Sequence, residues 1–388
     1  MLLFGIGMLL LVAIVVGTVV GFLKSKDDDS SSMDDVGGDD SLSGGGGGGL
    51  SLTDTESPSQ TPRTLLFDFI RSQLPGKTGN SLNDPESSAG RAYAALVSML
   101  LMKQQDDERN ANDTTSVTPI LYAPDDHESA YYATHFVSLG IFFLDASGPT
   151  HWTRADGWLT ADPICSWYGI GCYPNGTLEA IWLPNNTLQG TIPGDQFSFE
   201  SLRVINLERN EFDQVGDRDS FSSLPSAFGR YHQLEELYLG YNNLKSEFPL
   251  AWYQGMTSVK ILDLQYNDVE IAGSLHREID WSVHSFEEVR LAGNDMSNDI
   301  LEFPWSPHLR VLDLSDGSRR RNNITIPDDF GANSILRGGW PNITEIYLHN
   351  NPSLIGSISS ELCDTVMAND GLIKVDCERV ACECCDCV

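Results

Sequence analysis

Apolar side chains recur in the second half of the chain at a fixed spacing that an asparagine closes. The pattern reads Leu-x-x-Leu-x-Leu-x-x-Asn, in which Ile, Val or Phe can stand for Leu. Seven copies span residues 178–186, 202–210, 234–242, 259–267, 286–294, 309–317 and 343–351. The sixth copy ends in Gly317 where the others carry Asn. A nine-residue pattern that returns this often indicates a repeat architecture.

The spacing predicts a leucine-rich repeat solenoid of the α/β type, with short parallel β-strands and irregular or 3-10 returns. Each unit can bury its apolar edge only against its neighbours, so the Leu and Ile side chains are expected to point inward and stack. The Asn amide is expected to turn inward and bond backbone groups, because buried polar groups need partners. Since Gly317 lacks that amide, we expect a looser coil there. The longest returns are insertions after Phe212 and in residues 272–285 and 318–341.

The beginning of the chain is apolar and then strongly polar. Residues 1–23 carry no charge, a length that can span a bilayer, and a cleaved signal peptide is the alternative. Lys24 and Lys26 follow directly, which by the positive-inside rule favours a cytosolic position for what comes next. Residues 24–63 are rich in Asp, Ser and Gly and are predicted to be a disordered linker.

Residues 64–173 are expected to form a helical N-terminal cap, because solenoid ends need protection. Helical spacing of apolar residues predicts helices over 65–74, 89–104 and 129–144. The candidate core residues of the last two are Tyr93, Leu96, Met99, Leu100, Tyr132, Phe136, Leu139 and Phe143.

Two further motifs resemble the plant-type extracellular subclass of leucine-rich repeat proteins. One is Leu188-Gln-Gly-Thr-Ile-Pro193, which follows the first Asn, and the other is Cys165-Ser-Trp-Tyr-Gly-Ile-Gly-Cys172, preceded by Trp158. The resemblance covers residues 152–363 and implies a recognition module at the cell surface. Residues 82–145 are similar to membrane leucine-rich repeat proteins of diatom-like algae.

Within this resemblance, Cys165 and Cys172 are expected to pair over the first coil. The other six of the eight cysteines, Cys363, Cys377, Cys382, Cys384, Cys385 and Cys387, are expected to staple a C-terminal cap over 363–388. Six cysteines allow fifteen pairings, so their connectivity stays open. A thiolate metal site is the alternative for this cluster. Five N-x-[ST] sequons, at Asn112, Asn175, Asn185, Asn323 and Asn342, together with the even cysteine number favour the secretory route.

Charge and motifs narrow the function. The chain has 55 acidic against 24 basic residues, which disfavours nucleic acid as a partner. Pro75-Gly-Lys-Thr78 resembles part of a phosphate loop, but position 71 is Arg where that loop needs Gly. No hydrolase, zincin or kinase signature occurs, so we expect neither an enzyme nor a cofactor.

Binding is therefore the expected activity, on the concave face that the strands expose. Aromatic residues and Arg are enriched at binding hot spots. The candidate ligand-binding residues are Trp182, Arg209, Tyr238, Tyr241, Tyr266, Arg290 and Tyr347. The first hypothesis is a plasma-membrane, single-pass recognition protein that binds a peptide, protein or glycan outside the cell and signals through a co-receptor. The alternatives are a structural or adhesive wall scaffold and a secreted form.

Overall fold

The computed structural model describes residues 62–74, 76–110, 127–192, 199, 201–213, 224–271, 284–296, 307–317, 324–326, 330 and 339–388. The chain divides into two compact units, Met1–Thr134 and His135–Val388. The expected membrane segment 1–23, nearly all of the linker and the sequons Asn112 and Asn323 lie outside the described residues. None of the helices in the described part is long and apolar enough to cross a bilayer.

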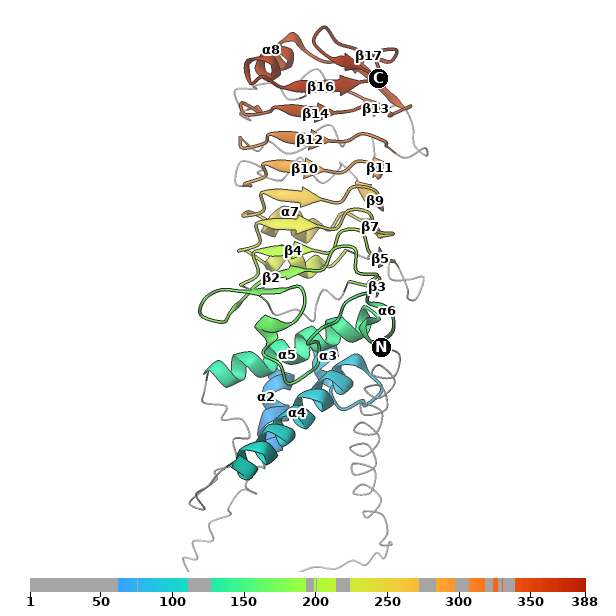
Figure 1. The fold of residues 1–388 in the computed structure, drawn as a ribbon. Coiled ribbons are helices and arrows are strands. Elements are labelled where there is room, and N and C mark those ends of the chain that lie inside the picture. The colour runs from blue at the N-terminus through green and yellow to red at the C-terminus, as the bar shows by residue number, and fades with distance from the viewer. Residues whose placement is uncertain are drawn as a thin grey trace, which may run out of the picture. The chain divides into compact units, whose positions relative to one another are not determined.

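The second unit is a solenoid whose seven repeat copies form adjacent parallel strands, as the spacing predicts (Figure 1). Matching apolar residues face one another between rungs, for example Ile181 with Ile205 and Leu237 with Leu262. The seven strands are β2 (Leu178–Trp182), β4 (Val204–Asn206), β6 (Glu236–Tyr238), β8 (Ile261–Asp263), β10 (Glu288–Arg290), β12 (Val311–Asp313) and β14 (Glu345–Tyr347).

The repeat asparagines are buried or half-buried, and their amides bond backbone groups, as expected. Asn294, fully buried, donates from Nδ2 to the carbonyl oxygens of Leu264 in the preceding coil (2.9 Å) and Leu291 in its own coil (3.0 Å). Its Oδ1 accepts from the backbone N–H of Val269 at 3.0 Å. Asn294 thus joins two neighbouring coils where the strand bends into its return, whereas Asn186 joins the first coil to Arg154 of the cap.

The expectation of a looser sixth coil is wrong for its strand. β12 pairs in continuous parallel register with both β10 and β14. The backbone N–H of Gly317 donates to Oδ1 of Asn351 in the next coil (3.0 Å). The neighbouring amide therefore serves the sixth coil, although that coil supplies no amide of its own.

The returns are more regular than predicted. Buried residues such as Leu188, Leu244 and Val269 hold successive returns close enough for short parallel strands to pair. These are β3 (Gln189–Gly190) with β5 (Glu211–Phe212), then β7 (Lys245–Glu247), β9 (Asp268–Ile271) and β11 (Asp295–Met296), and finally β13 (Ile324–Thr325), β15 (Leu354–Ser357) and β17 (Val380–Ala381). In the described residues, the returns after β5 and β7 also carry helices, the 3-10 helix η2 (Ser226–Arg230) and α7 (Leu250–Gly255).

The N-terminal end of the solenoid is closed by aromatic side chains. The Trp158 ring lies 4.9 Å from that of Trp152 and 5.2 Å from that of Trp167, measured between centroids. Phe136 and Phe143, from the later part of α5 (His127–Asp145), contact Trp167 and Trp158. The short helices α6 (Gly148–His151) and η1 (Ile164–Ser166) lie between these aromatic residues in sequence.

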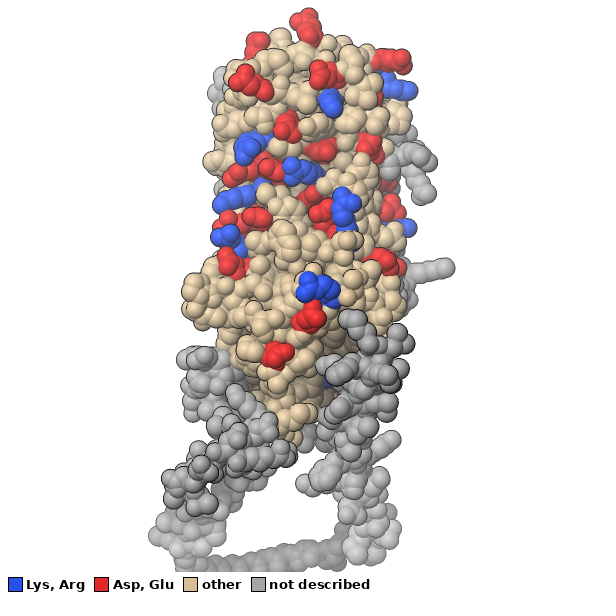
Figure 2. Space-filling model, viewed as in Figure 1, with Lys and Arg blue, Asp and Glu red and all other residues tan. Residues whose placement is uncertain are grey.

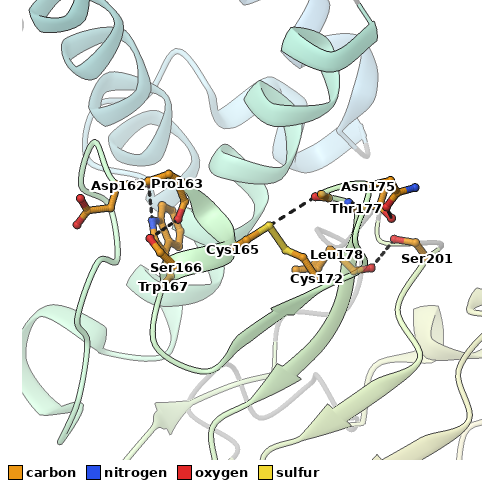
Figure 3. Close-up of a disulfide and its surroundings, with 11 residues drawn as sticks. Asp162, Pro163, Cys165, Ser166, Trp167, Cys172, Asn175, Thr177, Leu178 and Ser201 are labelled. Atoms are coloured by element: carbon orange, nitrogen blue, oxygen red, sulfur yellow. Dashed lines mark hydrogen bonds between the residues drawn. A yellow bond between two sulfur atoms is a disulfide. The ribbon is translucent and has the colours of Figure 1, made fainter.

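The predicted disulfide between Cys165 and Cys172 is present in this cap (Figure 3). Cys172 ends β1 (Ile170–Cys172), which pairs antiparallel with β2 and so covers the first edge of the parallel sheet. The indole N–H of buried Trp167, between the two cysteines, donates to the carbonyl oxygen of Asp162 (3.0 Å). The bridge thus fastens the segment that shields the open edge of the stack.

The sheet continues beyond residue 362, into the segment 363–388 that the sequence predicts as the C-terminal cap. β16 (Leu372–Val375) pairs parallel with β14, and β18 (Asp386–Cys387) pairs with β16. α8 (Ser360–Ala368) precedes them. The six C-terminal cysteines pair as Cys363–Cys384, Cys377–Cys387 and Cys382–Cys385. The sulfur atoms of Cys363, Cys382 and Cys384 lie close together, but in disulfides, so the structure does not support the thiolate metal site.

The first unit contains the helices α2 (Pro62–Gln73), α3 (Gly76–Ser81) and α4 (Ser88–Asn110). The two longer ones are those predicted, and α3 occupies the stretch that resembles a phosphate loop. Tyr93 and Leu96 are buried as expected, and the Tyr93 ring meets that of Phe67 edge-on at 5.4 Å. Met99 and Leu100 are only half-buried, so the described core of α4 ends earlier than predicted.

Candidate functional site

The concave face is the open side of the parallel strands, where every second side chain points away from the core. Its central column begins with Trp182, which is 48% exposed and meets Tyr238 edge-on at 6.2 Å. Tyr238, Arg290 and Tyr347 lie in the same column, because each is the last residue of its strand. The structure therefore places these four candidates on one surface.

The other three candidates form a row, which we call the outer ladder. The guanidinium carbon of Arg209 lies 4.1 Å from the ring centroid of Tyr241. The Tyr241 ring in turn stacks on that of Tyr266, with centroids 4.7 Å apart. All three residues have positive φ, between 52° and 57°, at the position before the repeat Asn. The turn that positions the Asn therefore also projects these side chains outward.

The outer ladder continues to Asp316, which sequence reasoning missed. The Tyr266 hydroxyl donates to Oδ2 of Asp316 (2.5 Å), and Nδ2 of Asn350 donates to its Oδ1 (2.8 Å). These hydrogen bonds help to lower the pKa of Asp316, while the Tyr266–Asp316 bond raises the pKa of Tyr266 to about 12. Tyr266 crosses the intervening coil at Gly293, where a Cβ atom would lie 2.6 Å from the tyrosine ring. A glycine at this place thus lets two coils that are not neighbours bond each other.

A second column of the face, two residues before the central one, carries glutamates. The Tyr238 hydroxyl donates to Oε2 of Glu236 at 3.1 Å, and that of Tyr347 donates to Oε2 of Glu345 at 2.9 Å. Arg290 pairs with Glu288 in the same way, at 2.5 Å. Burial and the bond to Glu345 raise the pKa of Tyr347 to about 12. The alternation of strand residues was the signal that could have revealed these acidic partners.

Asp263 is a buried carboxylate in the central column. It is only 4% exposed, and burial raises its pKa from 3.8 to about 6. Its Oδ1 and Oδ2 accept from the backbone N–H (3.1 Å) and the amide of Gln265 (2.7 Å). Asn206 occupies the same place two rungs earlier, where its Oδ1 accepts from the backbone N–H of Glu208 (3.0 Å). A neutral amide can therefore accept the backbone hydrogen bond at this position without burying a charge.

The substitution Asp263→Asn is expected to stabilise the protein at pH 7.5 by about 1–2 kcal/mol. A pKa raised by about two units costs about 3 kcal/mol at high pH, and the lost second acceptor offsets part of the gain. Because the folded-state pKa lies above the unfolded one, the stability that Asp263 contributes is complete below pH 3.8 and is lost as pH rises through about 6. Urea unfolding from pH 4 to 8 tests this, and a variant less stable than the parent at pH 7.5 contradicts it.

A row of charged residues lies at the side of the sheet where the chain enters each strand, and we call this row the edge charge ladder. Its six residues alternate in sign from rung to rung: Glu179, Arg203, Glu235, Lys260, Glu287 and Arg310. Ion pairs join Arg203 to Glu179 (3.7 Å), Lys260 to Glu235 (2.8 Å) and Arg310 to Glu287 (3.9 Å). Figure 2 shows acidic and basic groups interleaved on the stack of strands. The edge charge ladder is neutral overall.

Three sequons lie among the described residues. Asn175, Asn185 and Asn342 are exposed. Asn185 precedes the first repeat Asn and has a φ of 51°, so its side chain belongs to the row that the outer ladder continues. A glycan on Asn185 would therefore stand at the N-terminal end of the concave face, close in sequence to Trp182.

No family model matches the chain. Pollen receptor-like kinase 2 of Arabidopsis thaliana is 30% identical over 166 residues, which are 42% of this chain and 23% of that protein. Receptor-like protein kinase BRI1-like 3 of the same plant is 29% identical over 170 residues, 42% of this chain and 13% of that protein. The chain thus spans less than a quarter of the length of either curated relative.

Among solved structures, the chain is similar to a pollen receptor kinase 3, with a TM-score of 0.38, 23% identity and coverage of 53% of this chain and 90% of that one. The Arabidopsis receptor kinase HAESA ectodomain, solved with a peptide hormone ligand, has a TM-score of 0.41 and 20% identity, covering 55% of this chain and 32% of that one. The two curated relatives are plant proteins, so the resemblance to algal proteins stays a prediction.

Proposed function

We propose that the protein is a non-catalytic recognition module at the cell surface, which binds a peptide, protein or glycan on the concave face of its solenoid. The observation that carries this proposal is the row of large side chains on one open sheet face, where Trp182 is 48% and Tyr266 40% exposed. Tyr and Trp offer a large contact area at a small cost in conformational entropy. A ligand that covers them would gain apolar burial and hydrogen bonds together.

The rest of the face is arranged to keep these side chains in place. Arg209 and Tyr241 hold one side of Tyr266, and Asp316 fixes its hydroxyl. Side chains that are already ordered lose little entropy when a ligand arrives, which favours affinity. The partial match to two receptor-like kinases is in keeping with recognition at a cell surface.

The wider context is also part of the proposal. An apolar segment over residues 1–23 would anchor the module in the plasma membrane, with the solenoid outside the cell. Four disulfides join all eight cysteines, which suits an oxidising exterior. The sequons would carry glycans there. Signalling would then require a co-receptor that contacts the complex of the module with its ligand.

The test is selection from a displayed library of random linear peptides on the full-length chain. We expect peptides that bind saturably and lose at least tenfold in affinity when Tyr238→Ala and Tyr266→Ala are combined, since about 1.4 kcal/mol corresponds to tenfold. The control is Tyr173→Ala, at a half-buried tyrosine of the cap outside the concave face. Peptides bound equally by both variants would contradict the proposal and favour a scaffold without a ligand on this face.

A further inference from the structure

We infer that the concave face takes a cationic segment, an extended stretch of peptide that carries Lys or Arg side chains. This inference rests on the proposed function and specifies its ligand. The concave face here means the central and second columns of the strands from β2 to β16, together with the outer ladder (Arg209, Tyr241, Tyr266 and Asp316), Glu208 and Asn350. Seven of its side chains are acidic, namely Glu208, Glu236, Asp263, Glu288, Asp313, Asp316 and Glu345, against the three basic residues Arg209, Arg290 and Lys374.

The hydrogen-bond partners of these carboxylates decide whether the excess of acidic residues leaves a net negative charge on the face. Among the described residues, five of the seven carboxylates are bonded only by neutral donors and form no ion pair, although Arg290 acts on Asp263 at longer range. Tyr hydroxyls donate to Glu236, Glu345 and Asp316. Gln265 donates to Asp263, and Ser315 donates to Asp313 from its hydroxyl (2.6 Å) and its backbone N–H (3.0 Å). Only Glu208 and Glu288 pair with an arginine of their own strand or turn.

In the edge charge ladder of the same coils, by contrast, the acidic side chains form ion pairs. There each of Glu179, Glu235 and Glu287 is paired with a basic side chain of the next rung. Both sets of residues recur from coil to coil. If the charge of the face reflected only the acidic composition of the chain, both sets would carry the same excess of acidic residues. The negative charge therefore gathers on the face that is open, and the adjoining edge is neutral. A surface of one sign attracts and orients a segment of the other sign.

The charge of the face also changes along the solenoid. In the two strand columns, the first two rungs present Ala180, Trp182, Val204 and Asn206, which carry no charge, and Glu208 of the second rung pairs with Arg209. The carboxylates without an ion pair begin at Glu236 and continue to the seventh rung. A fitting segment would place an apolar or aromatic residue over Trp182 and its basic residues over the later rungs. Exposed Tyr266, beside Asp316, offers a ring on which a Lys or Arg can also stack.

The experiment compares two triple variants of the full-length chain that each remove three negative charges. The face variant is Glu236→Gln, Asp313→Asn and Glu345→Gln, in which each amide oxygen can still accept the existing hydrogen bond. The edge variant is Glu179→Gln, Glu235→Gln and Glu287→Gln. The probe is a labelled octapeptide of alternating Lys and Gly, and its binding is followed by fluorescence anisotropy at low ionic strength. Unfolding midpoints in urea confirm that both variants are folded.

We expect the face variant to bind the probe about tenfold more weakly and the edge variant to bind within about twofold of the parent, with binding that weakens as salt is added. Equal weakening in both variants would show attraction to net charge alone and overturn the inference. Selected library peptides that bind the face but lack Lys and Arg would also overturn it, while the proposed function would stand. If no library peptide binds the face, the proposed function itself fails.

Discussion

Replacement of Asn294 by alanine is expected to lower the free energy of unfolding by about 3–4 kcal/mol. The side chain is fully buried and bonds two coils at once. Without it, the N–H of Val269 and the carbonyl oxygen of Leu264 lose their partners inside the solenoid, where water cannot replace the amide. Each buried group left without a partner costs about 1–3 kcal/mol. Urea unfolding followed by far-ultraviolet circular dichroism measures the loss.

The matched control is Asn243→Ala, an asparagine one position after a repeat Asn. Its side chain is exposed, so its removal should change stability by less than about 0.5 kcal/mol. A similar loss in both variants would mean that the stack does not depend on the asparagine bonds. No loss in either variant would contradict the placement of Asn294 between the coils.

A methyl group added at Gly255 is expected to cost about 3 kcal/mol. Gly255 ends α7, and a Cβ atom there would overlap the carbonyl oxygen of Gly229 in η2. A Cβ at Gly229 would likewise overlap the carbonyl oxygen of Ala251. The two helical returns can therefore pack only at the distance that glycine permits. Forcing them apart would strain the buried contact of Trp252 with Phe228, whose rings stack at 5.9 Å between centroids.

Gly76→Ala is the control for this substitution. A Cβ at Gly76, the first residue of α3, would meet no atom within 4 Å. Alanine also favours a helix over glycine by up to about 1 kcal/mol, so this variant should be as stable as the parent or slightly more stable. Thermal melts of both variants test the pair. A Gly255→Ala protein that melts with the parent would show that η2 and α7 do not touch as described.

Much of the fold of this protein follows from local sequence pattern and backbone chemistry, before the tertiary structure is known. The spacing from Leu178 to Asn351 predicts seven parallel rungs, because only one alternation of side chains buries every apolar residue. The inward asparagine amides follow from the need of buried backbone groups for partners. The helices α2, α4 and α5 follow from apolar periodicity, and the Cys165–Cys172 bridge from the motif around Trp167. Four of the seven candidate residues of the concave face, Trp182, Tyr238, Arg290 and Tyr347, follow from strand alternation.

Other features depend on residues that are distant in sequence and meet only in the folded stack. Tyr266 bonds Asp316 across Gly293, a contact between coils that have another coil between them. The pairing of the six C-terminal cysteines depends on where β16 and β18 extend the sheet, and neither strand carries the full repeat pattern. The division between a neutral edge and an acidic face likewise appears only when the rungs lie in register. The repeat spacing is a property of each coil, so the sequence alone predicts the rungs. Charge balance and side-chain partners depend on contacts between coils, so only the tertiary structure decides them.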